Sequence, residues 1–178
     1  MRRLIPALVL AALPLAAQTS GEFKRWEVHG SIGGGKSYDD EGSIGSGLSG
    51  GFGVGKRVTR RIGVEGEYTH LRHKREISGG AFIWEGSANL FTGNFLLHFR
   101  PERRVQPFVL IGAGGMTYEG SGPGFAWNCG AGVKAYLTGH WFIRPEVRIS
   151  SGDYDRGPSQ PEPPLSNIRV QFGVGYRW

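Results

Sequence analysis

The sequence has little of two things that stabilise or anchor many proteins, cysteine and long apolar runs. Cys129 is the one cysteine among 178 residues, which excludes an intrachain disulfide framework. After residue 17 no run reaches the ~18 apolar residues that a membrane-spanning helix needs. No convincing amphipathic helical pattern is present either. The fold must therefore be built from neither disulfides nor long helices.

Glycine, in contrast, is abundant. The chain has 31 glycines in 178 residues, about 17%, against an average usage of ~7%. These glycines follow no collagen period and are not gathered in a low-complexity tail. They are scattered through segments of alternating polarity, which suits tight turns and a crowded interior.

The first seventeen residues have the features of a secretory signal peptide. Arg2 and Arg3 precede an apolar stretch from Leu4 to Leu15, and Ala16 and Ala17 offer a cleavage site before residue 18. This apolar stretch is shorter than the ~20 residues that span a bilayer. We therefore predict a signal peptide over residues 1–17 and one domain over residues 18–178.

The charge of the chain is basic, with a formal net charge of +6. Removal of the signal peptide, with Arg2 and Arg3, lowers it to +4. The basic residues lie in turns and alternate along strands, and they form no single stripe. We therefore expect no nucleic-acid partner.

Alternation of polarity with a period of two recurs along the chain, and such a period predicts β-strands. Between the strands, short basic turns alternate with longer glycine-rich or proline-rich loops, as in outer-membrane barrels. The third and fourth strands are long enough for their hairpin to extend beyond a membrane. We predict an all-β fold, an eight-stranded antiparallel up-and-down transmembrane β-barrel. Its strands are Phe23–Gly34, Leu48–Arg57, Ile62–Glu76, Ala81–Phe99, Val105–Tyr118, Phe125–Leu137, Trp141–Ile149 and Asn167–Trp178.

Two strands carry irregular signals. Pro145 lies inside the seventh strand, where it removes a ladder hydrogen bond, so a bulge or local irregularity is expected there. Both faces of the fifth strand are apolar or small, which leaves its orientation open. One orientation would turn Phe108, Leu110, Met116 and Tyr118 outward.

Alternation alone does not say which face is inside, and a water-soluble lipocalin-like barrel would hide the apolar face. Here the polar face is mostly Gly, Ser and Asn, which makes a poor soluble surface but fits a narrow lumen. Its charges can also compensate one another across an interior that side chains nearly fill. We therefore predict a membrane barrel. Its polar lumen network comprises Glu27, His29, Glu65, Glu67, Lys134, Arg144, Glu146, Arg148, Arg169 and Gln171.

Aromatic residues gather near the strand ends, as the interfacial girdles of membrane barrels require. The predicted interfacial aromatics are Trp26, Tyr68, Phe99, Phe108, Tyr118, Trp127, Trp141, Tyr176 and Trp178.

The segment from Gly130 to Arg148 resembles the penultimate hairpin of small OmpA-like outer-membrane barrels, a group that includes OmpX-like proteins. It reads Gly130-Ala-Gly132, Leu137-Thr138, Trp141 and Arg144-Pro-Glu-Val-Arg148. The last twelve residues resemble the C-terminal signal that the barrel-assembly machinery reads, with Trp178 where Phe is usual. The resemblance implies location in the bacterial outer membrane. It further implies contact with outer-membrane lipid and lipopolysaccharide, the assembly machinery as a partner, and a monomer.

Several motifs suggest other activities. Gly30 to Ser37 matches a phosphate-binding loop, and Gly45 to Gly50 matches a dinucleotide fingerprint, but neither has the strand–turn–helix setting that such motifs need. His29-x-Ser31, with Glu27 on the same face, has the spacing of PagL-like lipid A deacylases. These three residues are more simply read as parts of a polar lumen. His70 and His73 read as solvated loop residues.

We therefore predict a protein that is not an enzyme, with no catalytic, cofactor-binding or metal-binding residues and no cofactor. Its expected role is structural or in surface interaction. A narrow channel for ions or small solutes is the first alternative. A lipid A-modifying enzyme is the second.

Overall fold

The structure is a computed structural model that describes residues 26–39, 42–77, 82–118, 122–153 and 165–178. The predicted signal peptide and the first three residues of the first predicted strand lie outside these ranges. Within them there is no helix long and apolar enough to cross a membrane.

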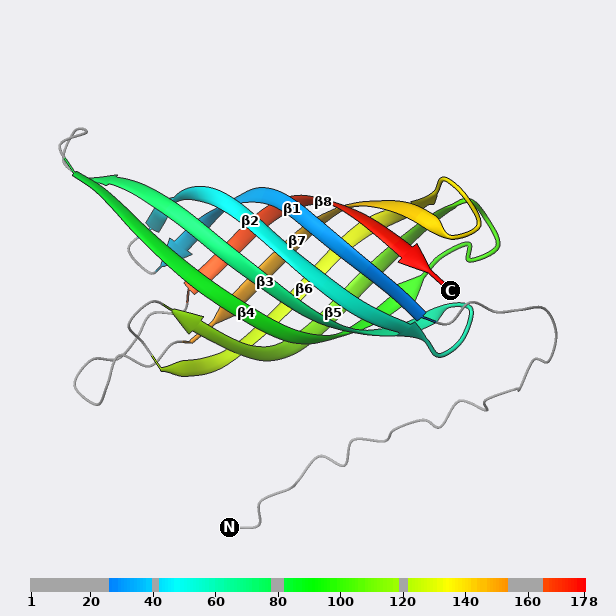
Figure 1. Cartoon of the computed structure of the whole chain (residues 1–178). Helices are drawn as coiled ribbons and strands as arrows, with labels where there is room; N and C mark the ends of the chain where they lie inside the picture. The colour runs from blue at the N-terminus through cyan, green and yellow to red at the C-terminus, as the bar shows by residue number, and fades with distance from the viewer. Residues whose placement is uncertain (1–25, 40–41, 78–81, 119–121, 154–164) are drawn as a thin grey trace, which may run out of the picture.

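Eight antiparallel strands form one closed barrel (Figure 1). Each strand pairs with its neighbours in sequence, and β8 pairs with β1 to close the wall. The predicted fold is therefore confirmed. The strands are β1 (Trp26–Asp39), β2 (Gly42–Arg57), β3 (Ile62–Ile77), β4 (Phe82–His98), β5 (Val105–Tyr118), β6 (Pro123–Tyr136), β7 (Trp141–Gly152) and β8 (Leu165–Arg177).

The β1–β2 hairpin is longer than its sequence pattern indicates. Glycines blur the alternation between residues 34 and 48, so the sequence pattern predicts a loop there. The pairing nevertheless continues to Asp39 and Gly42, with one shift between Ser37 and Tyr38. The phosphate-loop match lies within β1 and is paired on both sides, with β2 and with β8. The dinucleotide match lies within β2. Neither segment is followed by a helix.

The β3–β4 hairpin reaches further than its neighbours at the end of the barrel that lies opposite the C-terminus (Figure 1). Its pairing runs from Ile62 opposite Leu97 to Ile77 opposite Phe82. The hairpin thus forms a ladder beyond the body of the barrel, as its length predicts.

The barrel is polar inside and apolar outside. The side chain of Arg148, on the inner face of the wall, is 0% exposed, whereas that of Ile32, on the outer face, is 73% exposed. A water-soluble barrel has the reverse arrangement, because burial of apolar surface drives its folding. This inversion rules against the lipocalin-like alternative. An outer surface of this kind needs an apolar solvent.

The orientation of β5 corrects one prediction. Phe108 is 1% exposed and points inward with Leu110 and Met116, while Val109 and Ile111 face out. Phe108 is therefore wrongly assigned as an interfacial aromatic. The reason lies on β6, where Gly132 pairs with Phe108 and leaves room for its ring. A Cβ at Gly132 would lie 2.7 Å from Phe108 Cζ.

Two apolar clusters interrupt the polar interior. One cluster lies near the end with the longer loops and includes Tyr118 at its edge, so Tyr118 is also not an outward-facing aromatic. Its buried members are Leu71, Ala88, Leu90, Met116, Ala126 and Leu165. The other cluster combines Leu96, Phe108 and Leu110. The alternation alone suggests a lumen that is polar along its whole length. The two apolar clusters show that it is not.

The expected irregularity at Pro145 takes the form of a gap in pairing. β6 and β7 pair up to Gly132 opposite Glu146 and resume at Ala135 opposite Ile143, in the same register. On its other side Pro145 stays in register with Phe172. Proline lacks the N–H that would complete the ladder, and no residue is inserted.

Candidate functional site in the barrel interior

All ten residues of the predicted lumen network are buried within the barrel. They fall into two groups. The central cluster is built on Glu65, Glu67, Arg144, Glu146 and Arg148, with His29, Arg169 and Gln171 at its edges. The turn-end cluster, nearer the short turns, contains Glu27 and Lys134.

Ion pairs in the central cluster join opposite walls of the barrel. β3 and β7 are four strands apart in a ring of eight. Arg144 Nη1 on β7 donates to Glu65 Oε2 on β3 at 2.5 Å, and Nη2 donates to Glu65 Oε1 at 3.1 Å. Arg148 Nη2 on β7 donates to Glu67 Oε2 on β3. Two arginines thus cross the lumen to two glutamates.

Glu146 links these pairs to β8. Arg144 Nε donates to Glu146 Oε2 at 3.1 Å, and Gln171 donates to Glu146 Oε1. Gln171 in turn accepts from Arg169 Nε at 2.9 Å. Arg169 Nη1 also donates to Ser150 Oγ at 3.1 Å. Buried charge is stable when paired and hydrogen-bonded, and this chain of contacts meets most of that need. Arg169 contacts the neutral Gln171 and Ser150, and its Nη2 has no hydrogen-bond partner.

The turn-end cluster gathers cations and hydroxyl around Glu27 on β1. Arg57 Nε lies 3.1 Å from Glu27 Oε1, and Lys134 Nζ pairs with Glu27 Oε2. The Tyr136 hydroxyl donates to Glu27 Oε1 at 3.1 Å. Arg57 Nη2 donates to the Tyr136 hydroxyl at 2.6 Å and to Gln106 Oε1 at 2.8 Å. Side chains of β2 and β6 therefore meet at the Glu27 carboxylate of β1, and Gln106 of β5 joins them through Arg57.

Sequence reasoning missed Arg57, Gln106 and Tyr136. Tyr136 shares its face with Lys134, so extending the alternation by one step would have found it. Arg57 ends the second predicted strand and continues a buried face, that of Gly53 and Gly55, but the predicted inward-facing residues stop at Gly55. Gln106 depends on the orientation of β5, which the pattern left open.

The buried charged side chains nearly balance. In the described barrel the buried charged residues are four glutamates and five cations. The cations are Arg57, Lys134, Arg144, Arg148 and Arg169. With neutral histidines the interior therefore carries one excess positive charge.

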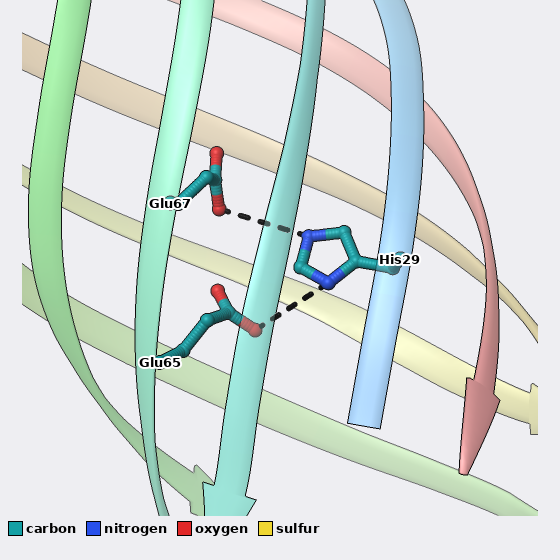
Figure 2. Close-up of side chains that lie close together, drawn as sticks. All are labelled: His29, Glu65 and Glu67. Carbon is teal, nitrogen blue, oxygen red and sulfur yellow. Dashed lines mark ion pairs between the residues drawn. The ribbon is translucent and has the colours of Figure 1, made fainter. Parts of the chain in front are cut away.

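The arrangement of His29, Glu65 and Glu67 resembles a metal-ligand set, because their ligand atoms all lie within 4.8 Å of one another (Figure 2). His29 Nδ1 is 3.7 Å from Glu65, and Nε2 is 3.8 Å from Glu67. However, Arg144 Nη1 lies 3.3 Å from both ring nitrogens. The guanidinium groups of Arg144 and Arg148 already neutralise the two carboxylates. The donor set therefore fits an ion-pair network better than a divalent cation.

The seat of His29 depends on a glycine. Gly53 on β2 pairs with His29, and a Cβ there would lie 2.4 Å from His29 Cε1. The imidazole therefore packs directly on the wall, and its nitrogens point toward Glu65 and Glu67 on β3 (Figure 2). Arg144 on β7 lies 3.3 Å from the same nitrogens.

The predicted interfacial aromatics divide by position. Trp26, Phe99, Trp127, Trp141 and Trp178 are exposed on the outer wall. Tyr68 packs between two exposed rings, 5.5 Å from Phe52 and 4.8 Å from Phe91 between centroids. Tyr176 stacks on His140 at 5.3 Å. Apart from Phe108 and Tyr118, the set faces outward or lies at the wall. Its contact with lipid head groups stays a prediction.

The sequence profile of the outer membrane protein beta-barrel domain matches residues 5–177. The chain belongs to this family. Polar interior, apolar wall and family membership agree on one location, the bacterial outer membrane. No protein with a curated description matches the sequence significantly.

Solved structures with a similar fold are also small outer-membrane barrels. Neisserial surface protein A (NspA) has a TM-score of 0.72 at 13% identity, over 86% of this chain and 97% of that one. The N-terminal barrel domain of Pseudomonas aeruginosa OprF has a TM-score of 0.55 at 15% identity, over 87% and 98%. OprG of the same organism has 0.55 at 14%, over 87% and 96%. These likenesses show the fold.

Membership in the family orients the barrel. Outer-membrane barrels have short turns on the periplasmic side and longer loops outside. The longest connection, residues 153–164 between β7 and β8, lies at the same end as the far-reaching β3–β4 hairpin (Figure 1), and the turns after β2, β4 and β6 lie at the opposite end. We therefore expect the turn-end cluster to lie toward the periplasm, and the apolar cluster around Leu90 and Met116 to lie toward the cell exterior.

Proposed function

We propose that this outer-membrane barrel is a closed, non-enzymatic scaffold with a structural or surface-interaction role. The observation that carries the proposal is the pairing of β7 arginines with β3 glutamates across the lumen. An eight-stranded barrel has an interior just wide enough for side chains to fill. Ion pairs that join opposite walls occupy the path that a permeating ion would need.

The apolar cluster near the longer loops supports the same proposal. Leu90, Met116 and Leu71 are buried toward the outer side of the charged network. An ion that entered from outside would first meet an apolar layer, where losing its hydration shell is costly. It would then meet side chains that are already paired with one another.

Planar-bilayer recordings test the closed state. Purified barrel should produce no discrete conductance steps, while a general porin under the same conditions gives steps and proves the sensitivity of the recording. A paired variant, Glu65→Ala with Arg144→Ala, removes one bridge without leaving a lone charge. It is the form in which conductance is most expected. Discrete steps from the unmodified barrel would refute the proposal in favour of a narrow channel.

The environment of His29 supports a non-enzymatic role. A serine hydrolase needs an imidazole that is free to accept the proton of its serine. Here both ring nitrogens face Arg144 or glutamates, and Ser31 is itself buried. Incubation with lipopolysaccharide should release no acyl chains. Release that disappears in His29→Ala would instead support the lipid A-modifying alternative.

We further infer that the alternating strand β8 serves as the assembly signal, and that the barrel is a monomer among outer-membrane lipid and lipopolysaccharide. The outward face of β8 supports this inference, since Ile168, Val170, Phe172 and Val174 are exposed and apolar. Phe172→Asp should lower the amount of assembled barrel in outer-membrane fractions. Arg169→Gln, on the inward face, is the control for a change that leaves the lipid-facing pattern intact.

A further inference from the structure

The turns after β2 and β4 carry a group of exposed cations that are not part of the lumen network. We define the rim cluster as Lys56, Arg60, Arg61, Arg100, Arg103 and Arg104, together with Glu102. All seven side chains are exposed. Six positive charges therefore face one negative charge across the turns that follow β2 and β4.

Contacts between the two turns bring these charges together. Arg60 Nη1 lies 2.6 Å from Glu102 Oε1. The backbone N–H of His98 donates to the carbonyl of Arg61 at 2.7 Å. The N–H of Arg103 donates to the carbonyl of Arg100 at 3.0 Å, which closes the second turn. The rim cluster is therefore one surface on ordered turns.

Most of this charge has no internal counter-charge. Glu102 pairs with Arg60, and within the described ranges Lys56, Arg61, Arg100, Arg103 and Arg104 form no ion pair. Repulsion among exposed like charges is unfavourable, and it is relieved by an anion that binds them. Most of the interior cations are paired with glutamates of the chain itself, whereas most of the rim cations are not. We therefore expect an external anion to bind the rim cluster.

Apolar side chains in the same turns indicate where that anion lies. Val58, Phe99 and Val105 are 50%, 45% and 53% exposed, and each lies within two residues of a rim cation in the sequence. Lys56 Nζ lies 5.0 Å from the centre of the Trp26 ring, on the outer wall. Basic side chains beside exposed apolar and aromatic ones are typical of a membrane–water interface. A soluble polyanion would leave Val58, Phe99 and Val105 in water.

We propose that the rim cluster binds the head groups of anionic glycerophospholipids in the periplasmic leaflet. The phosphates would pair with the turn arginines, and the acyl chains would cover the apolar residues between them. This site is separate from the lumen and does not depend on whether the barrel conducts. It rests on the periplasmic position of the short turns in this family.

Quenching of tryptophan fluorescence by brominated lipids tests the proposal. Trp84→Phe with Trp127→Phe leaves Trp26, Trp141 and Trp178, which are all at the turn end. This background is reconstituted in phosphatidylcholine vesicles that contain a minor fraction of brominated phosphatidylglycerol or brominated phosphatidylcholine. The ratio of the two quenching curves gives the preference for the anionic lipid. We expect about fivefold or more, the effect of even one basic side chain at a charged membrane surface.

A charge-matched pair of variants locates the preference. Arg61→Gln, Arg103→Gln and Arg104→Gln together should bring the ratio close to one. The control carries Lys36→Gln, Arg72→Gln and Lys74→Gln, three exposed cations at the other end of β1 and β3, and should keep the original ratio. Circular dichroism of both variants checks that the barrel is folded. Raising the salt from about 0.01 M to about 1 M should weaken the preference, because the screening length falls from ~30 Å to ~3 Å.

Each result decides the proposal. Loss of preference in the rim variant, with retention in the control, supports it. A ratio near one in the unmodified background overturns it, and so does a preference that the rim variant retains or that both variants lose equally. If the rim variant keeps its lipid preference but loses binding to purified peptidoglycan, the partner is the cell wall and the lipid proposal is wrong.

Discussion

The interior and the rim cluster of this barrel are both rich in cations, but their cations differ in how far they are paired with glutamates. Inside, five cations accompany four glutamates, and four of the five cations form ion pairs with them in two clusters. At the rim, six cations meet one glutamate. Burial explains the contrast, because a charge removed from water must find a partner within the protein. An exposed charge keeps its water and stays available to a ligand. The balance of charge therefore distinguishes the interior residues, which stabilise the fold, from the residues of the rim cluster, which we propose bind a ligand.

The largest expected effect comes from breaking one interior pair. Arg144→Met leaves Glu65 with its main partner removed, and it also deprives Glu146 of a donor. Removal of one member of a buried pair typically destabilises by about 3–5 kcal/mol. Urea unfolding in lipid vesicles should show this loss. Arg104→Met, which removes a rim cation, should stay within about 0.5 kcal/mol of the unmodified barrel. Equal losses in the two variants would contradict the contrast between the regions.

The packing of the interior gives the next effect. Gly132→Val places a side chain where a Cβ already lies 2.7 Å from Phe108 Cζ and from Glu146 Cβ. Overpacking of this kind costs about 1–3 kcal/mol. Gly66→Val is the control, since a Cβ there meets nothing within 4 Å. The free energy of unfolding should fall for Gly132→Val and not for Gly66→Val. A fall of similar size in both would show that loss of glycine, rather than crowding, is responsible.

Removing both members of an interior pair should cost less than the two single changes together. In a cycle of Glu65→Leu, Arg144→Met and the double variant, we expect a coupling of about 0.5–3 kcal/mol. The sign is favourable because the double variant leaves neither partner of that pair buried alone, although Arg144 also contacts Glu146. The three unfolding free energies give the coupling directly. A value near zero would mean that the network stabilises through other contacts.

The rim should give the smallest effect. Arg60 and Glu102 form an ion pair whose side chains are 51% and 68% exposed. Pairs this exposed contribute about 0.2–1 kcal/mol, and salt screens them. A cycle of Arg60→Ala and Glu102→Ala should give a coupling in that range at low salt and none at high salt. A salt-resistant coupling as large as that of Glu65 and Arg144 would remove the distinction between rim and interior.

Much of the fold follows from the sequence because a strand in a membrane barrel meets two different environments. The bounds of β5, Val105–Tyr118, agree with the alternating segment, and the ten lumen residues were found by their parity. The alternation does not identify the inward face of a strand whose two faces are both apolar or small. On β5 the choice was made by Gly132 on the neighbouring strand, which accommodates Phe108. A single strand carries no such information.

The candidate site was partly hidden for a related reason. Arg57 ends a strand and starts a basic turn, so its sequence neighbours suggest exposure, while its partners Glu27 and Tyr136 lie 30 and 79 residues away. The apolar cluster of Leu71, Leu90 and Met116 comes from three strands and forms only when the barrel closes. Long-range register decides these contacts, and local pattern does not contain it.

The gap in pairing beside Pro145 has a consequence for the mechanics of the wall. Opposite Pro145, the carbonyl of Val133 lacks the N–H donor that another residue would supply, and the pairing of β6 with β7 is interrupted at Val133 and Lys134 although the register on either side is intact. A gap in the ladder lowers the local cost of opening the strands, so hydrogen exchange should begin earlier along this stretch of β6 and β7 than where their ladder is continuous. Strain applied across the barrel would then concentrate at the seam between β6 and β7. The closed wall thus contains one stretch of weaker strand pairing, which results from the N–H that Pro145 lacks.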